Sequence, residues 1–278
     1  MNGERGLGRK GNGSSSGGRR LPFTVHRLPF TLVLLTSCSG LSPFRGHAVV
    51  GRDAYLVFVG NGAGGQSDLF AVRGDGGPVF PLTYSSVPER APALSPDGGT
   101  VAFLRGHAAA DPHPGVVWVL NLLSGAEREV QLPRGAGQPT ALGWSKDGRG
   151  LYVRVDTTVF GLVAPPASGE GQVVAGAERA EADSSFAVLL GQPAFGRVVP
   201  CATDLCVQTP NGGPPTPFAS NAHDAVRWGT DSVGYVSGPD LIVRPVGPGR
   251  PRRVEWSGAP ARIGGLTFFS GNSVNSER

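Results

Sequence analysis

Apolar and polar residues alternate in short runs along most of the chain, which is the pattern of half-buried β-strands. Leu151, Val153 and Val155 fall on one face of a predicted strand, and Val101 and Phe103 share a face of an earlier one. No segment shows a long, regular helical period. The 44 Gly and 25 Pro residues supply turns between the runs. The pattern therefore predicts an all-β protein built from many short strands.

A short polar motif stands before each of these two strands, and its two copies lie 50 residues apart. Ser, Pro, Asp and Gly in this order favour a type I turn, because Pro fixes φ at the second position and Gly accepts a positive φ at the fourth. Such a turn joins two antiparallel strands. Turn formation explains the motif without a functional role. Its residues are Ser95, Pro96, Asp97 and Gly98 in the first copy and Ser145, Asp147 and Gly148 in the second.

Looser copies of this pattern continue along the chain. Their anchor residues, 35 to 50 positions apart, are Val49, Leu94, Trp144, Val188, Trp228 and Ile263. A second hairpin usually follows each anchor, and four short strands in 40–50 residues make one propeller blade. Six anchors predict a single β-propeller of six blades with an incomplete last blade. A strand near residues 47–50 would help to close the ring, and five blades is the competing count.

The first copy of the motif lies in a longer pattern that resembles a known family. Residues 82–103 run from Leu-Thr through a polar loop to Ala-Pro-Ala-Leu-Ser-Pro-Asp-Gly and an apolar strand. This order is similar to the TolB-type β-propeller repeat. Residues 139–155 resemble it as well, with Lys146 where the motif prefers Pro. The resemblance implies a propeller in which the Ser-Pro-Asp-Gly residues are structural, so no functional site is carried over through them.

The N-terminal segment is typical of an export signal. The apolar run 28–35 follows several arginines and is too short to span a bilayer, which takes about 20 apolar residues. It suits the core of a signal peptide. The run ends in Leu-Thr-Ser-Cys, which resembles the lipobox of bacterial lipoproteins, whose Cys is diacylated and becomes the new N-terminus. We therefore expect an exported protein that is anchored to a bacterial membrane through Cys38 and faces the periplasm or the cell exterior. An ordinary signal peptide with a chance Cys, or a buried strand, is the alternative.

These signals divide the chain into four parts. We expect a disordered basic leader with the signal peptide over residues 1–37, a tether over 38–46, the propeller over 47–270 and a disordered tail over 271–278. The net charge is +4, but the leader holds six basic residues and one acid. The remainder is close to neutral, so no nucleic-acid partner is expected. We expect a monomer.

Two cysteines remain as an even pair if Cys38 carries lipid. Cys201 and Cys206 flank a four-residue loop between predicted strands, and a hairpin would bring them into disulfide range. An oxidising compartment favours the bridge over two unpaired, half-buried thiols. No second pair of Cys or His lies nearby, so a zinc site is not expected.

Common catalytic motifs are missing from the sequence: it has no Gly-x-Ser-x-Gly elbow, no His-Glu-x-x-His, no P-loop and no dinucleotide fingerprint. His107, Asp111 and His113 share the loop 106–115, where two imidazoles and a carboxylate could hold a metal ion. The loop is rich in Ala and contains two prolines, which favours a plain surface loop. We therefore predict no metal, no cofactor and no catalytic residue, and we take this loop as the first candidate for a contact surface.

Two classes of function remain after these exclusions. The favoured one is a non-catalytic binding module whose loop face or funnel binds a protein, peptide or glycan. The other is a funnel-based enzyme, such as a metal-assisted lactonase or a glycan-cleaving enzyme. The dipeptide His223-Asp224 precedes a predicted strand, and either forms a turn hydrogen bond or lies at the rim of a ligand pocket. Carboxylates and imidazoles around the funnel would favour the enzyme, and small or apolar residues the binding module.

Overall fold

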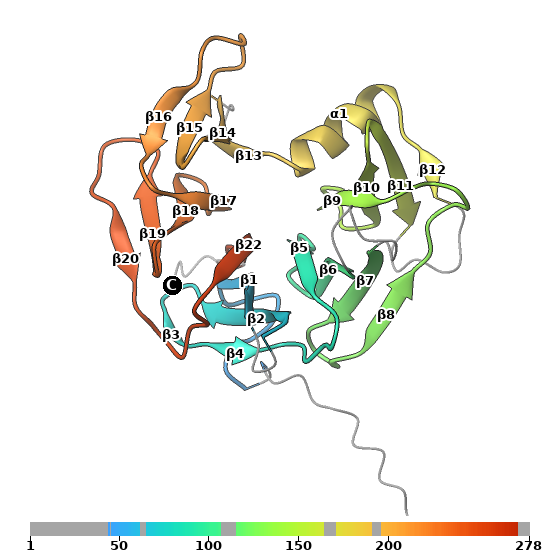
Figure 1. Cartoon of the computed structure of the whole chain (residues 1–278), viewed down its shortest axis with the longest axis horizontal. Helices are drawn as coiled ribbons and strands as arrows, with labels where there is room; N and C mark the ends of the chain where they lie inside the picture. The colour runs from blue at the N-terminus through green and yellow to red at the C-terminus, as the bar shows by residue number, and fades with distance from the viewer. Residues whose placement is uncertain are drawn as a thin grey trace, which may run out of the picture. The chain divides into compact units, whose positions relative to one another are not determined.

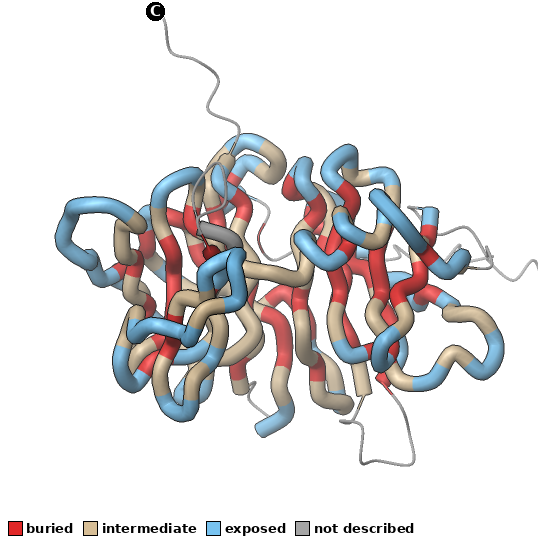
Figure 2. Tube along the Cα trace, turned by 90° about the horizontal axis from the view of Figure 1, so that it is seen from above, coloured by how far each residue is buried: buried red, intermediate tan, exposed pale blue. Residues whose placement is uncertain are grey.

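Antiparallel sheets of four strands succeed one another along the chain in the computed structural model (Figure 1). The structure describes residues 44, 46–61, 65–106, 115–163, 171–190 and 196–271, which all belong to one compact unit of the chain. Within these residues, five four-stranded sheets form the blades of a single β-propeller. Figure 2 shows the blades from the side, with buried residues along the strands and exposed residues mainly in the turns.

The first three blades each run from an innermost strand to an outermost one (Figure 1). Blade 1 contains β22 (Ile263–Phe269), β1 (Tyr55–Asn61), β2 (Ser67–Arg73) and β4 (Phe80–Pro81), in this order outwards. Blade 2 contains β5 (Glu89–Leu94), β6 (Thr100–Arg105), β7 (Val116–Asn121) and β8 (Glu127–Val130). Blade 3 contains β9 (Pro139–Trp144), β10 (Gly150–Val155), β11 (Thr158–Val163) and β12 (Gln172–Val173).

The remaining two blades complete the ring. Blade 4 contains β13 (Val188–Leu190), β14 (Gly196–Cys201), β15 (Asp204–Gln208) and β16 (Thr216–Ala219). Blade 5 contains β17 (His223–Trp228), β18 (Ser232–Ser237), β19 (Asp240–Pro245) and β20 (Arg252–Val254). Outside the blades, β3 (Gly77–Pro78) and β21 (Trp256–Ser257) form a short parallel pair that links blades 1 and 5.

The predicted count of six blades is wrong, and the competing count of five is confirmed. The last anchor, Ile263, does not open a sixth blade, because β22 pairs with β1 and becomes the inner strand of blade 1. The first anchor, Val49, lies in no strand, and residues 46–50 form turns around a single bridge residue, Ala48. The expected closure by a strand near residues 47–50 is therefore replaced by closure through the C-terminal strand. The other four anchors lie in the inner strands of blades 2 to 5.

A short helix, which the sequence pattern did not predict, lies between blades 3 and 4. Helix α1 (Gly176–Ser185) contacts both β9 and β13 (Figure 1). Its Ala and Glu residues favour a helix, but Ala182 is the one buried residue of the segment, so the helical period is weak. Ala182 packs with Tyr152 and Val159 of blade 3. The helix therefore fills the space between two blades. In the described part of the chain, no helix has the length and the apolar composition that crossing a bilayer demands.

Candidate functional site

The two turns of the repeated motif have the same internal hydrogen bonds. The Ser95 hydroxyl donates to Asp97 Oδ1 (2.5 Å) and accepts from the backbone N–H of Thr100 (2.9 Å). Ser145 and Asp147 repeat this arrangement at 2.7 Å, and the hydrogen bond from Ser145 lowers the pKa of the Asp147 carboxyl. The side chains of both motifs are thus engaged in their own turns, which gives them a structural role.

The neighbouring inner strands β22, β5 and β9 run side by side in the same direction. Near the ends of these strands, the backbone N–H of Leu94 in β5 donates to Thr267 Oγ1 of β22 (3.0 Å), and Trp144 Nε1 of β9 donates to Ala93 O (2.9 Å). The propeller therefore has two distinct faces. We name the face where the inner strands begin the funnel face, and the face where they end, which carries the Ser95 and Ser145 turns, the turn face.

A pocket of about 440 Å³ opens on the funnel face between blades 3, 4 and 5. Helix α1 supplies one wall, and the starts of β13 and β17 supply another. Val188, Val198 and Leu205 provide apolar surface. The charged or titratable lining residues are Arg154, Asp183, Arg197, His223 and Asp224. We call this cavity the funnel pocket.

A bulge in β17 directs Asp224, one of the two acidic residues of the funnel pocket. The register between β17 and β18 shifts between His223 and Val226, and Asp224 has a φ of 52°, which is uncommon for a residue other than Gly. Bulges of this kind turn a side chain away from its regular direction. Asp224 Oδ2 lies 2.6 Å from His223 Nδ1 and 3.5 Å from the position that a Cβ on Gly264 would occupy. The carboxylate therefore lies between the imidazole and the inner strand of blade 1.

A disulfide-bonded hairpin holds the wall of the pocket next to His223. Cys201 and Cys206 are bonded across the turn between β14 and β15, with their Cα atoms 5.9 Å apart. The turn is tied to the chain that enters β17, because Ala222 N donates to Thr203 O (3.1 Å) and Asn221 N donates to Asp204 Oδ1 (2.8 Å). The cross-linked hairpin therefore positions the start of β17.

Removing this disulfide is expected to lower the stability of the domain. For the short loop that Cys201 and Cys206 close, the chain-entropy model gives about 2 kcal/mol, which corresponds to roughly 4–8 °C in Tm for a domain of this size. The variant carrying Cys201→Ala and Cys206→Ala should show this decrease in a thermal unfolding experiment. Reductant should lower the Tm of the wild type by a similar amount and leave the variant unchanged. An unaltered Tm in the variant would contradict the prediction.

Helix α1 forms the opposite wall of the funnel pocket through aromatic and charged contacts. The Arg154 guanidinium lies over the ring of Phe186, 4.8 Å from its centroid. Asp183 forms an i,i+4 ion pair with Arg179 at 3.0 Å, on the exposed side of the helix. The pocket thus combines a stacked guanidinium, two carboxylates and an imidazole, and these groups come from blades 3 and 5 and from helix α1.

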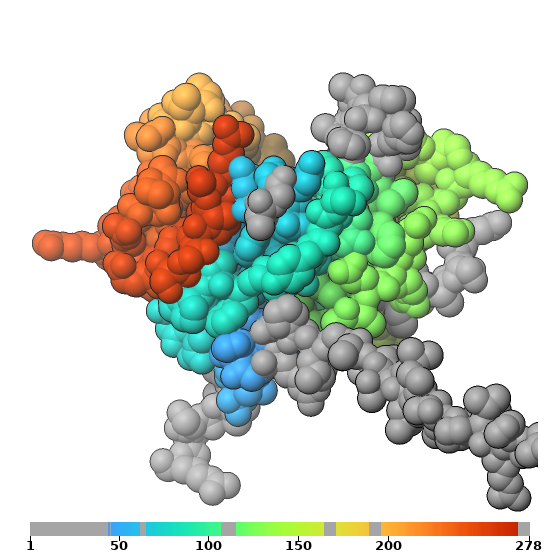
Figure 3. Space-filling model, turned by 60° about the horizontal axis from the view of Figure 1, so that its bottom comes forward, coloured from blue at the N-terminus to red at the C-terminus, as the bar shows by residue number. Residues whose placement is uncertain are grey.

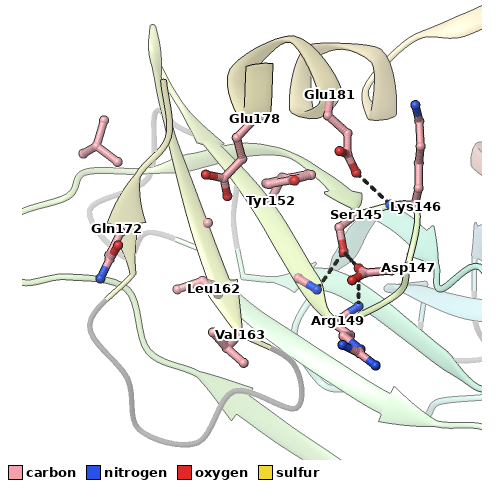
Figure 4. A pocket seen from close by; sticks show the side chains of 13 residues that line it. Ser145, Lys146, Asp147, Arg149, Tyr152, Leu162, Val163, Gln172, Glu178 and Glu181 are labelled. Atoms are coloured by element: carbon pink, nitrogen blue, oxygen red, sulfur yellow. Dashed lines mark hydrogen bonds between the residues drawn. The ribbon is translucent and has the colours of Figure 1, made fainter. Parts of the chain in front are cut away.

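A second, larger cavity of about 680 Å³ lies on the other side of α1 (Figure 4). Glu178 and Glu181 of α1 face Tyr152 of β10 there, and Glu181 Oε1 accepts a hydrogen bond from the backbone N–H of Lys146 (2.8 Å). Burial raises the pKa of the Tyr152 hydroxyl, and the nearby carboxylates of Glu181 and Glu178 raise it further. One blade and the helix alone line this cavity, and its polar groups support the Ser145 turn. The funnel pocket is therefore the better candidate site.

Several of the predicted site residues lie outside the described residues. These are Cys38 and the loop residues His107, Asp111 and His113. The base of that loop is described: Arg90 Nη1 of β5 donates to Gly106 O (3.1 Å), at the funnel face. His223 and Asp224 fit both interpretations of their dipeptide, since they contact each other and line the funnel pocket.

Sequence reasoning missed the other polar residues of the funnel pocket. The strand pattern places Arg154 on the polar face of a strand and indicates no more than that. No sequence motif marks Asp183 or Arg197 as site residues. Their grouping depends on α1 and on contacts between blades, which no local pattern shows. In the described part of the chain, no group of three or more His, Cys, Asp or Glu residues is arranged to hold a metal ion.

Comparison with known proteins finds similar solved structures at low sequence identity. No protein-family model and no curated protein matches the chain. TolB from Acinetobacter baumannii is a similar solved structure, with 13% identity, 77% of this chain and 66% of that chain covered, and a TM-score of 0.49. This chain therefore spans just under two thirds of the length of that TolB.

Other solved structures are similar at the same low level. A candidate TolB from Agrobacterium tumefaciens shows 12% identity, with 78% of this chain and 72% of that chain covered and a TM-score of 0.37. The periplasmic gluconolactonase of Pseudomonas aeruginosa shows 17% identity, with 72% and 67% covered and a TM-score of 0.34. TolB structures are thus among those that this chain resembles, as the repeated motif predicted. Likeness at this level carries no conclusion about the activity or the partner of this chain.

Proposed function

We propose that the chain is an exported, lipid-anchored β-propeller that binds a protein, peptide or glycan at its funnel face and carries no catalysis of its own. The observation that carries this proposal is the funnel pocket. Three blades and α1 converge there, and the disulfide-bonded hairpin of blade 4 holds one wall in place. A preformed wall reduces the entropy that binding has to overcome.

The lining of the funnel pocket suits a partner with mixed chemistry. The Arg154 guanidinium can bind a carboxylate, the carboxylates of Asp183 and Asp224 can accept donors, and Phe186 offers an aromatic surface. Few, separated polar groups on an apolar wall orient a ligand. Gly106 and Gly115, the two ends of the loop 106–115, both lie next to Arg90 at the funnel face, and this supports our proposal that the loop is a second contact surface.

Capture of a partner should depend on the exposed polar groups of the funnel pocket. The side chains of His223 and Asp183 are about half exposed, so replacing them should change stability by no more than about 0.5 kcal/mol. In crosslinking and pull-down from membranes, a variant with His223→Ala and Asp183→Ala should recover at most a tenth of the partner that the wild type recovers. Glu129→Ala, at an exposed position of the outer strand β8, is the matched control and should recover the full amount. Equal recovery by both variants would contradict the proposal.

A funnel-based enzyme is the second candidate, and the His223–Asp224 contact favours it. A carboxylate 2.6 Å from an imidazole nitrogen orients the ring, and an oriented imidazole is a common general base. Purified protein should be assayed with lactones, glycans and peptides. Turnover that disappears with His223→Ala, while Glu129→Ala remains active, would place the protein in the enzyme class.

A further inference from the structure

We propose that part of the turn face rests on the lipid bilayer, so that the funnel pocket faces away from the membrane. The surface consists of Val49, Val50 and Leu123, and we call it the apolar turn patch. The proposal rests on the lipid anchor at Cys38 that is part of the proposed function. The proposal goes beyond the anchor, because it states which face of the propeller lies on the bilayer and which residues contact the lipid.

The apolar turn patch exposes large apolar side chains that the domain does not cover. Val49 is 48% exposed and Leu123 is 57% exposed, and Val50 is half-buried beside them. These residues surround a pocket of about 400 Å³ that the chain segment before β1 forms with the end of β7. Exposed apolar residues that gather in one place mark interaction surfaces more often than single ones do.

The apolar turn patch belongs to the turn face. Leu123 follows β7 where this strand ends, and Val49 lies in the segment that leads into β1. That segment contacts the Ser95 turn, since a Cβ on Gly51 would lie 3.1 Å from Asp97 O. The tyrosine at the start of β1, Tyr55, hydrogen-bonds through its hydroxyl to the carbonyl of Gly98 in the same turn. Both halves of the patch are therefore on the side opposite to His223.

The short chain segment between the lipid anchor and the domain favours the bilayer as the surface that covers this patch. Phe44 is fully buried, with its ring centroid 5.1 Å from that of Tyr55, so the chain is fixed to the domain next to the patch. Figure 3 shows this first part of the described chain, in blue, at the rim of blade 1. Cys38 precedes Phe44 by six residues, and six extended residues reach at most about 20 Å. A lipidated Cys38 would therefore keep the turn face within about 20 Å of the bilayer.

The charges around the patch are compatible with contact to a membrane. Arg52 pairs with Asp53 (3.1 Å), and Arg73 pairs with Asp75 (2.8 Å), so the nearest charges are compensated in pairs. These charge pairs around the apolar turn patch add no net repulsion from anionic lipids. The apolar side chains of the patch can therefore enter the interfacial region of the bilayer. The acyl chains would supply the affinity, and the patch would set the orientation.

Quenching by labelled lipids measures which face meets the membrane. The mature lipidated protein, which begins at Cys38, is reconstituted in vesicles of phosphatidylethanolamine and phosphatidylglycerol that contain spin-labelled lipid. A fluorophore is attached through Leu123→Cys or Val49→Cys on the turn face, or through Tyr84→Cys as the matched control. Tyr84 is 77% exposed and precedes β5 at the funnel face. The bonded Cys201 and Cys206 and the acylated Cys38 do not compete for the label.

We expect quenching at residues 123 and 49 to exceed that at residue 84 several-fold. In the anchored protein, Val49→Asp should reduce quenching at residue 123 and leave the protein in the membrane fraction. Equal quenching at the two faces, or stronger quenching at residue 84, overturns the proposed orientation without contradicting the lipid anchor.

Cell fractionation tests the anchor separately: the wild type should be in the membrane fraction and Cys38→Ser in the soluble fraction. A wild type that is already soluble overturns both the anchor and this inference.

Discussion

A chain that ends at Arg262 is expected not to fold. This truncation removes β22, which is the inner strand of blade 1 and pairs with β1 along its length. It also removes the stacking of Phe268 on Trp228 of blade 5, at 3.8 Å between ring centroids. The apolar strand β1 would be left with an open edge, which promotes aggregation. The loss of the strand that closes the ring would exceed the net stability of a typical domain, about 5–15 kcal/mol.

Solubility and circular dichroism of the truncated chain check this expectation. The truncated protein should be insoluble or lack the β-sheet signal of the wild type. A chain that ends at Gly271 keeps all of β22 and is the matched control, and it should fold as the full-length protein does. A soluble, cooperatively unfolding protein that ends at Arg262 would show that closure through β22 is not required.

The same closure explains why the sequence predicts the repeat but not the number of blades. Turn chemistry is local, so the motif at Ser95 and its copy at Ser145 identify strand pairs correctly. Ring closure joins residues more than 200 positions apart, as Tyr55 and Phe269 show, and no local pattern indicates such a contact. The pattern therefore makes Val49 and Ile263 anchors of two blades, although Ile263 belongs to blade 1 and Val49 to none.

The candidate site is less accessible to sequence reasoning than the fold. The dipeptide His223-Asp224 is visible in the sequence, but the bulge that turns Asp224 toward β22 depends on pairing with β18. Arg154 and Phe186 meet only because α1 occupies the space between blades 3 and 4. The helix buries a single residue, so its sequence carries almost no amphipathic signal. Contacts between elements, rather than patterns within them, assemble the funnel pocket.

Glu89 is also not apparent from the sequence, although it forms the most buried charge contact among the described residues. Its side chain is fully buried at the start of β5. Oε1 accepts from Nε and Nη2 of Arg105, at 2.9 and 2.7 Å. Oε2 accepts from the Leu69 backbone N–H at 3.1 Å and from the Thr83 hydroxyl. Burial raises the pKa of the Glu89 carboxyl, and the bonds from Thr83 and Arg105 oppose this effect. The carboxylate thus connects blades 1 and 2.

Replacing Glu89 with Ala is expected to destabilise the propeller by about 3–5 kcal/mol, because it removes the buried acceptor of the Arg105 guanidinium and of the Thr83 hydroxyl. The Leu69 N–H keeps its second hydrogen bond, to Thr83 Oγ1 (2.9 Å). Thermal unfolding should show a decrease of roughly 6–20 °C in Tm. Glu127→Gln is the matched control: Glu127 contacts the same Arg105 at 2.6 Å from a more exposed position, and its loss should cost about 1 kcal/mol or less.

A double variant separates the loss of the ion pair from the loss of packing. Glu89→Met combined with Arg105→Met removes both charges and keeps apolar volume, so it should recover part of the stability that Glu89→Ala loses. We expect this recovery because the single variant takes the buried carboxylate from a mostly desolvated Arg105, which the more exposed Glu127 compensates only in part. If the double variant is no more stable than Glu89→Ala, the loss of stability comes from the hydrogen bonds to Leu69 and Thr83. The propeller would then require the polar connection between blades 1 and 2 at this position, and not charge compensation.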